Sequence, residues 1–311
     1  MSTKEDLCLL SEEGILDIHG EPYPNVPFRD VSVVAGAACQ KQLAVIVDKR
    51  KVWTLSSEKW HQAVSTDIKL NCLCWTPDQR LLVGTENARI AWVSRGALEF
   101  IDSFDDLPER NLWITPWGGP PDVRSLAISK DGIIFANIHV GWIVRSKDGG
   151  KTWQNLRKGL EMDVHQVATH PSNPAIVFAA TAEGFFFSKN YGETFIQEKS
   201  GMPYYYQRAC ACFIEKDVYL VSTSRGPHDQ ADAQLYRSVD SGKNWQLVKG
   251  LPDKIGKNIN TYQIIITPDG GALTIVEDTF LFETKDWGKN WEEAGNSYPK
   301  LYGAVVVPGN R

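Results

Sequence analysis

The stretch that decides the fold is Ser146-Lys147-Asp148-Gly149-Gly150-Lys151-Thr152-Trp153. Related octapeptides start at Ser188, Ser238 and Thr284, so the pattern returns about every 40 to 50 residues. Each copy begins with Ser or Thr, has Asp or Asn at its third place and Gly at its fifth, and closes with an aromatic residue. Self-similarity at such a period is typical of repeat architectures.

Each octapeptide is predicted to be a turn between two strands. An Asp side chain accepts hydrogen bonds from backbone N–H groups ahead of it, and Gly adopts a positive φ without strain. The closing aromatic residue then starts the next strand and packs its large ring into the core. Because each copy satisfies its polar groups locally, we assign the octapeptide to folding rather than to ligand binding.

Four short strands per repeat predict the blade of a β-propeller. The first, inner strands of the blades are expected at 31–35, 72–75, 125–128, 166–168, 209–212, 263–266 and 303–306. The sequence therefore predicts an all-β, seven-bladed propeller of four-stranded antiparallel blades, with one domain over residues 1–311. Residues 8–18 supply two further strands, so the closing blade is expected to be shared by the N- and C-termini. A six-bladed ring is the alternative.

Composition excludes several classes of protein. The 311 residues are 42% hydrophobic and carry a formal net charge of −5, which argues against disorder and against nucleic-acid binding. No apolar run approaches the roughly 18 residues of a membrane span, and the N-terminus lacks the pattern of a secretory signal. We therefore predict a cytoplasmic protein with no nucleic-acid and no membrane partner. The six cysteines are expected to be small core residues.

With this octapeptide, the Asp box, the chain resembles the Asp-box (BNR-repeat) β-propeller superfamily over nearly its whole length. That superfamily includes sialidases, sortilin-type receptors, xyloglucanases and the photosystem II assembly factor. The resemblance implies the fold and says little about function, because unrelated activities share this scaffold. Phe28-Arg29-Asp30-Val31 matches only the first two places of the sialidase Phe/Tyr-Arg-Ile-Pro motif, and sialidase propellers have six blades. Sialidase activity is therefore not expected.

The predicted site is the mouth of the central channel, on the face where the inner strands begin. Two long loops, 105–122 and 224–232, are expected on that face, and insertions on one face of a repeat protein commonly mark its binding side. The candidate ligand-binding residues are Asp30, Trp117, Arg124, Tyr206, Arg208, Arg225, His228 and Tyr262. Guanidinium groups suit a carboxylate, phosphate or sulfate, and aromatic rings suit a planar or sugar-like small molecule. Internal ion pairs with aspartates are the alternative role of the arginines.

His139, His165 and His228 are the candidates for chemistry. His139 or His165 is the candidate general base or other catalytic group. Together the three imidazoles are a candidate site for a divalent transition metal, although their spacing has no local ligand signature. Three functions stay open: a module that binds a small-molecule ligand, a hydrolase, lyase or metal-dependent enzyme, and a scaffold for a protein partner. The sequence does not decide whether the chain is an enzyme.

Overall fold

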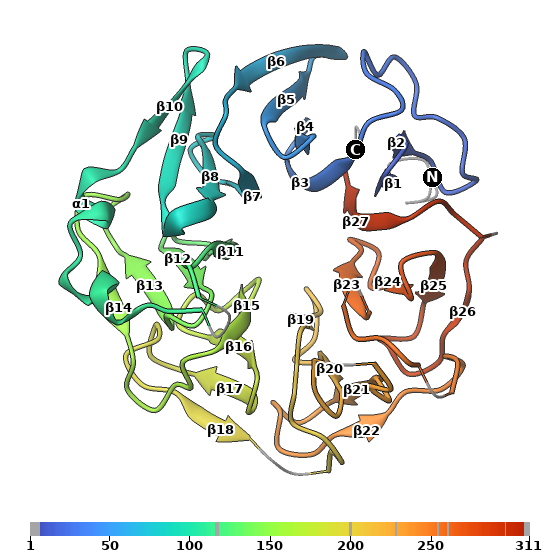
Figure 1. Ribbon diagram of the computed structural model, residues 1–311. Helices are drawn as coiled ribbons and strands as arrows, with labels where there is room; N and C mark the ends of the chain where they lie inside the picture. The colour runs from blue at the N-terminus through green and yellow to red at the C-terminus, as the bar shows by residue number, and fades with distance from the viewer. Residues whose placement is uncertain are drawn as a thin grey trace. The chain divides into compact units, whose positions relative to one another are not determined.

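The computed structural model describes residues 7–115, 118–198, 201–227, 229–253, 255–259, 261–295 and 297–307. Within these residues the strands form seven antiparallel sheets, six of four strands and one of three (Figure 1). The fold is a seven-bladed β-propeller, which confirms the predicted class over the six-bladed alternative. The chain separates into two compact units, Met1–Asn155 with Tyr298–Arg311 and Leu156–Ser297, and each is described by itself.

The first unit holds four of the sheets. Its elements are β1 (Leu7–Ser11), β2 (Gly14–Leu16), β3 (Val33–Cys39), β4 (Gln42–Val47), β5 (Lys51–Ser56), β6 (Lys59–Ser65), β7 (Leu70–Trp75), β8 (Leu81–Thr85), η2 (Glu86–Ala88), β9 (Ile90–Ser94), β10 (Ala97–Phe100), α1 (Asp102–Asp105), η3 (Pro108–Leu112), β11 (Val123–Ile128), β12 (Ile134–Ile138), β13 (Ile143–Ser146), β14 (Gln154–Leu156) and β27 (Leu301–Val306). Three sheets follow chain order as four-stranded meanders, β3 to β6, β7 to β10 and β11 to β14.

The fourth sheet of this unit joins the two ends of the chain. Its order is β2-β1-β27, and β1 pairs with β27 in the antiparallel sense, with Leu7 opposite Val306 and Leu10 opposite Gly303. The prediction that both termini share the closing blade is confirmed. Three strands of this blade lie in the described part of the chain, and a single antiparallel bridge between Leu16 and Pro22 follows β2.

The second unit holds three four-stranded meanders, again in chain order. Its strands are β15 (Val164–Thr169), β16 (Val177–Thr181), β17 (Gly184–Ser188), β18 (Ile196–Glu198), β19 (Cys210–Cys212), β20 (Tyr219–Thr223), β21 (Gln234–Ser238), β22 (Gln246–Leu247), β23 (Gln263–Ile266), β24 (Ala272–Val276), β25 (Phe280–Thr284) and β26 (Glu292–Glu293). The second strand of each sheet is buried at every position. Burial on both faces explains why these strands are almost continuously apolar instead of alternating.

The four octapeptides connect the third and fourth strands of their sheets. In the first copy Gly150 N donates to Ser146 Oγ at 2.8 Å, and the same bond measures 2.9 to 3.2 Å in the other three. Asp148 Oδ1 accepts from Lys151 N and Thr152 N at 3.1 and 2.9 Å. Hydrogen bonds from Thr152 lower the pKa of Asp148 to about 2. All these groups bond within their own turn, which supports the folding role expected of the octapeptide.

Two early sheets use a shorter turn at the corresponding place. Ser57 and Glu58 connect β5 to β6, and Arg95 and Gly96 connect β9 to β10. All four residues have positive φ, between 48° and 83°. Two consecutive residues with positive φ match the right-handed twist of a hairpin, so these blades replace the octapeptide with a two-residue turn.

The long segment before β11 is partly helical rather than an open loop. It contains η3, and Trp113, which follows η3, is buried in the core of the first unit with Phe104 and Ile138. Trp113 is therefore a core residue. None of the helices in the described residues is long and apolar enough to cross a bilayer.

Candidate functional site

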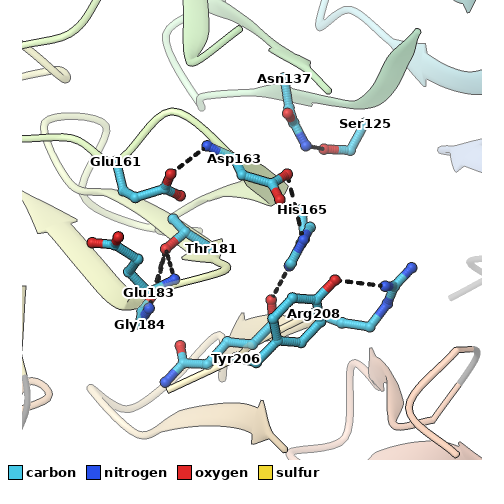
Figure 2. Close-up of polar contacts among 11 residues, drawn as sticks. Ser125, Asn137, Glu161, Asp163, His165, Thr181, Glu183, Gly184, Tyr206 and Arg208 are labelled. Atoms are coloured by element: carbon cyan, nitrogen blue, oxygen red, sulfur yellow. Dashed lines mark hydrogen bonds and ion pairs between the residues drawn. The ribbon is translucent and has the colours of Figure 1, made fainter. Parts of the chain in front are cut away.

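Three of the predicted site residues, His165, Tyr206 and Arg208, lie together in the second unit (Figure 2). His165 lies inside β15, whereas Tyr206 and Arg208 belong to the segment that leads into β19. The ring centroids of His165 and Tyr206 are 4.6 Å apart. Arg208 Nη1 donates to the Tyr206 hydroxyl at 3.3 Å. We name these three residues the Arg208 site.

Both ring nitrogens of His165 face protein oxygens. Nδ1 hydrogen-bonds to the backbone carbonyl of Gln207, and because a carbonyl only accepts, Nδ1 carries a proton. Nε2 lies 3.5 Å from Asp163 Oδ1, and the His165 side chain is only 2% exposed. A general base needs a ring nitrogen within reach of its substrate. This geometry favours a supporting role for His165 over the predicted catalytic one, which stays a prediction.

The backbone of residues 206–208 is held by hydrogen bonds from two sheets. Gln207 N donates to Thr181 O, at the end of β16, at 2.9 Å, and the Gln207 side chain is fully buried. Arg208 N donates to Ser222 Oγ of β20 at 3.2 Å. In extended chain, neighbouring side chains point to opposite sides. Burial of Gln207 therefore directs Tyr206 and Arg208 to the other side, where both are half-buried.

Arg208 has no carboxylate partner among the described residues. No Asp or Glu oxygen of these residues lies within 4.0 Å of its guanidinium nitrogens, and its side-chain hydrogen bond goes to the neutral Tyr206 hydroxyl. A half-buried charge is usually paired. Within the described residues, the alternative role, an ion pair with an internal aspartate, is therefore not seen at Arg208.

Carboxylates gather on the other side of His165. Asp163 N donates to Glu161 Oε1 at 2.7 Å, and Glu183 lies in the turn between β16 and β17 (Figure 2). Burial raises the pKa of Glu161, and repulsion from Asp163 and Glu183 raises it further. The hydrogen bond from Asp163 N acts in the opposite direction and lowers it. In the described part of the chain, no Lys, Arg or His nitrogen lies within 4.0 Å of the Glu161 or Glu183 carboxylates. Within the described residues, Glu161 and Glu183 therefore have no basic side chain next to them.

Replacing Glu161 with Gln is expected to raise the free energy of unfolding at pH 7. A carboxyl group whose pKa is raised on folding destabilises the fold above that pKa, and the cost disappears as pH falls below the unfolded value of about 4.3. Gln keeps an oxygen to accept from Asp163 N. Urea unfolding at pH 7 and near pH 4 checks this. The free energy of unfolding of E161Q should be higher than that of the wild type at pH 7 and equal to it near pH 4. The exposed Glu215→Gln variant is the control, and a less stable E161Q at pH 7 contradicts the expectation.

Arg225 is bound to Asp232 of its own loop and to Tyr204. Its Nε donates to the Tyr204 hydroxyl at 3.0 Å, and its Nη2 lies 3.3 Å from Asp232 Oδ2. Tyr204 in turn donates to Asp232 at 2.6 Å. The side chain of Arg225 is still 60% exposed. Arg225 thus has an internal ion pair, which is the alternative role that sequence reasoning left open for the arginines.

Tyr262 is buried, and its hydroxyl donates to Ala233 O at 3.3 Å. Burial raises the pKa of this hydroxyl. A side chain that is only 2% exposed offers almost no surface to a ligand. The geometry favours a packing role for Tyr262, and its predicted ligand contact stays a prediction.

The remaining described candidates belong to the first unit. Asp30 is exposed, and its N–H donates to Glu13 O at 3.1 Å. Arg124 lies inside β11 and is half-buried. His139 follows β12, is buried, and donates from its N–H to Asp122 O at 2.9 Å. The structure does not test their predicted roles in binding and catalysis.

Trp117 and His228 lie outside the described residues, so the three-histidine metal site stays a prediction. Among the residues that the structure describes, no group of three or more His, Cys, Asp and Glu side chains is placed to hold a metal ion. In the Arg208 site, His165 lies next to the carboxylate of Asp163.

Sequence reasoning missed Gln207 and Ser222, which fix the position of Arg208. A signal for Gln207 was present, because a polar residue between two outward-facing site residues must point inward in extended chain. Ser222 lies in a buried second strand. Its neighbours in the sequence do not indicate which group its hydroxyl would bond. Its partners, Arg208 N and Ala209 N, belong to the segment before β19.

No family model matches the chain. It is 30% identical over 106 residues to a xyloglucanase of Hypocrea jecorina, and 31% identical over 81 residues to a vacuolar protein sorting/targeting protein 10 of Verticillium alfalfae. These matches cover 34% and 26% of this chain and only 12% and 5% of the relatives. The chain therefore spans a small part of the curated relatives that it matches.

The fold is similar to that of a solved structure of YCF48 bound to D1 peptide, with a TM-score of 0.59. The match covers 85% of this chain and 82% of that chain, at 14% identity. At such low identity the likeness concerns the fold alone, and it agrees with the propeller described above.

Proposed function

We propose that the chain is an Asp-box propeller, a single domain that binds an anionic small molecule through Arg208. The observation that carries the proposal is the half-buried guanidinium of Arg208, which has no carboxylate partner among the described residues. Arg presents a planar fork of donors that matches the oxygens of a carboxylate, sulfate or phosphate. An anion from outside would supply the counter-charge that the described residues do not.

The rings next to Arg208 suit a planar ligand. Tyr206 is half-buried beside the guanidinium, and its hydroxyl is already oriented by Arg208 Nη1. A planar carboxylate could contact the tyrosine ring while its oxygens bind the guanidinium. An anion with a planar or aromatic group therefore fits these surroundings.

Replacing Arg208 with Gln is expected to weaken anion binding at least tenfold. The probes are sulfate and benzoate, titrated against chloride at constant ionic strength, with binding read by calorimetry and by the rise in melting temperature that ligand binding produces. The backbone bond of residue 208 to Ser222 does not depend on the side chain, so R208Q should fold.

The control is Arg95→Gln, which changes an exposed arginine of the first unit without touching the site. R95Q should bind both probes as the wild type does. A wild type that responds to neither probe, or an R208Q variant that binds them unchanged, contradicts the proposal.

A protein partner is the second candidate. Tyr205 is 42% exposed and Arg225 is 60% exposed, and Tyr and Arg are the residue types that anchor protein interfaces. A relative in fold is YCF48, solved with a bound D1 peptide. An acidic peptide segment would use the same Arg208 guanidinium as a small anion. The predicted enzyme activity, transition-metal site and cytoplasmic location stay predictions.

A further inference from the structure

We infer that His165 is the positioning residue of the Arg208 site. On this inference, which rests on the proposed anion binding at Arg208, the imidazole holds residues 206–208 in the conformation that presents the guanidinium. It does so without touching the ligand. The predicted roles of His165 as general base or metal ligand would then be replaced by a role that acts through its neighbours.

The first route from His165 to Arg208 runs through the peptide group of Gln207. The carbonyl of Gln207 accepts from His165 Nδ1, and its N–H donates to Thr181 O at 2.9 Å. β15 and β16 therefore hold this one residue from both sides. Because Arg208 is bonded directly to Gln207, fixing that peptide sets where the Arg208 side chain starts and which way it points.

The second route runs through the ring of Tyr206. His165 and Tyr206 lie with centroids 4.6 Å apart and planes tilted by 52°. The Tyr206 hydroxyl accepts from Arg208 Nη1 at 3.3 Å. The chain of contacts from imidazole to tyrosine ring to guanidinium orders the arginine before any ligand arrives. Ordering completed during folding does not have to be repeated at binding, so affinity rises.

Asp163 lies beside the other ring nitrogen of His165. Its Oδ1 lies 3.5 Å from His165 Nε2, while its own backbone is anchored by Asp163 N to Glu161 and by Ala182 N to Asp163 O at 3.0 Å. Nε2 thus lies beside the Asp163 carboxylate, while Nδ1 makes the hydrogen bond to the Gln207 carbonyl. Carboxylate, imidazole and peptide carbonyl thus form one line that ends next to Arg208 (Figure 2).

A second buried histidine in the same unit provides a matched comparison. His170 comes directly after β15, at the opposite end of that strand from Val164. Its Nε2 bonds to Asp217 Oδ1 at 2.8 Å, and its Nδ1 accepts from Ser172 N and Asn173 N at 3.2 and 3.1 Å. His170 fixes a turn rather than the segment before β19. We therefore expect its removal to destabilise the unit without disturbing residues 206–208.

The experiment compares His165→Asn, His165→Phe and His170→Asn in the full chain. Asn keeps an N–H donor near the position of Nδ1, and Phe keeps a ring against Tyr206 without any donor. Sulfate is the probe. We expect His165→Phe to weaken sulfate binding at least fivefold and His165→Asn to restore it to within about twofold of the wild type. His170→Asn should lower the melting temperature and leave sulfate affinity unchanged.

A second readout needs no ligand. The side-chain Nε–Hε signal of Arg208 in a ¹H–¹⁵N NMR spectrum, assigned by its loss in R208Q, reports whether the guanidinium is ordered. His165→Phe should broaden or shift this signal, and His170→Asn should not. The inference is overturned if His165→Phe leaves both sulfate affinity and the Arg208 signal unchanged, or if His170→Asn alters them equally. A wild type that ignores sulfate contradicts the proposed function alone, because the Arg208 signal still tests His165.

Discussion

A chain that ends at Pro299 is expected to lose the cooperative unfolding of its first unit. The deletion removes β27, which pairs with β1 along its whole length and contributes Leu301 and Val305 to the core. Without β27, β1 keeps only the three-residue β2 as a partner, and a two-stranded hairpin is marginal in water. The expected loss is on the order of 5 kcal/mol or more, which is comparable with the whole stability of a domain.

Urea unfolding followed by tryptophan fluorescence and by circular dichroism measures this loss. The control is a chain that ends at Val307, which keeps β27 complete and should unfold at the same urea concentration as the full chain. The chain ending at Pro299 still contains Tyr298, whose hydroxyl bonds to Ile18 O. If that chain melts as the full chain does, the closing sheet is not needed for the stability of the unit.

The fold could be predicted from the sequence because its signals are local and repeated. Six of the seven predicted inner strands overlap the first strand of a sheet in chain order, and the prediction for 263–266 coincides with β23. The seventh, 303–306, overlaps β27 of the closing sheet. The octapeptide marks the end of a third strand, as Ser146 marks the end of β13. The two-residue turn at Ser57 and Glu58 was not recognised, because positive φ at two ordinary residues has no strong signature.

The site was harder to predict, because its chemistry depends on which charges meet. Arg208 and Arg225 look alike in the sequence. In the structure Arg225 forms an ion pair with Asp232, whereas Arg208 has no carboxylate partner among the described residues. The orientation of the His165 ring depends on Gln207, which is 42 positions away in the chain. No spacing rule connects such partners, because the ordering of the sheets brings them together.

A second repeat also escaped sequence reasoning. A glycine follows three of the four closing aromatic residues by five or six places, as Gly159, Gly201 and Gly250 follow Trp153, Phe195 and Trp245. All three glycines have positive φ, between 75° and 86°. Their backbones approach the next closing aromatic residue: a Cβ on Gly250 would lie 1.9 Å from Trp291 O. Each of these glycines therefore lies in a segment between two sheets, called the linker here, and packs it against the octapeptide turn of the following sheet.

Replacing Gly250 with Ala is expected to lower the free energy of unfolding by about 2–4 kcal/mol. Two causes act together, since φ at this position is +86° and the new methyl group would overlap the backbone of Trp291. The backbone has little freedom to move away, because Trp291 N donates to Lys249 O at 2.8 Å and Lys249 N donates to Lys289 O at 3.1 Å. Urea unfolding followed by circular dichroism gives the measurement.

Gly256→Ala is the matched control in the same unit. A Cβ on Gly256 meets nothing within 4 Å, and its φ lies outside the left-handed region. The same change of one methyl group should there leave stability within about 0.5 kcal/mol, because ordinary surface substitutions stay in that range. Equal effects of G250A and G256A would mean that the linker is not in contact with the Trp291 turn. A loss confined to G250A shows that the close contact, and not glycine content, stabilises the junction of the two sheets.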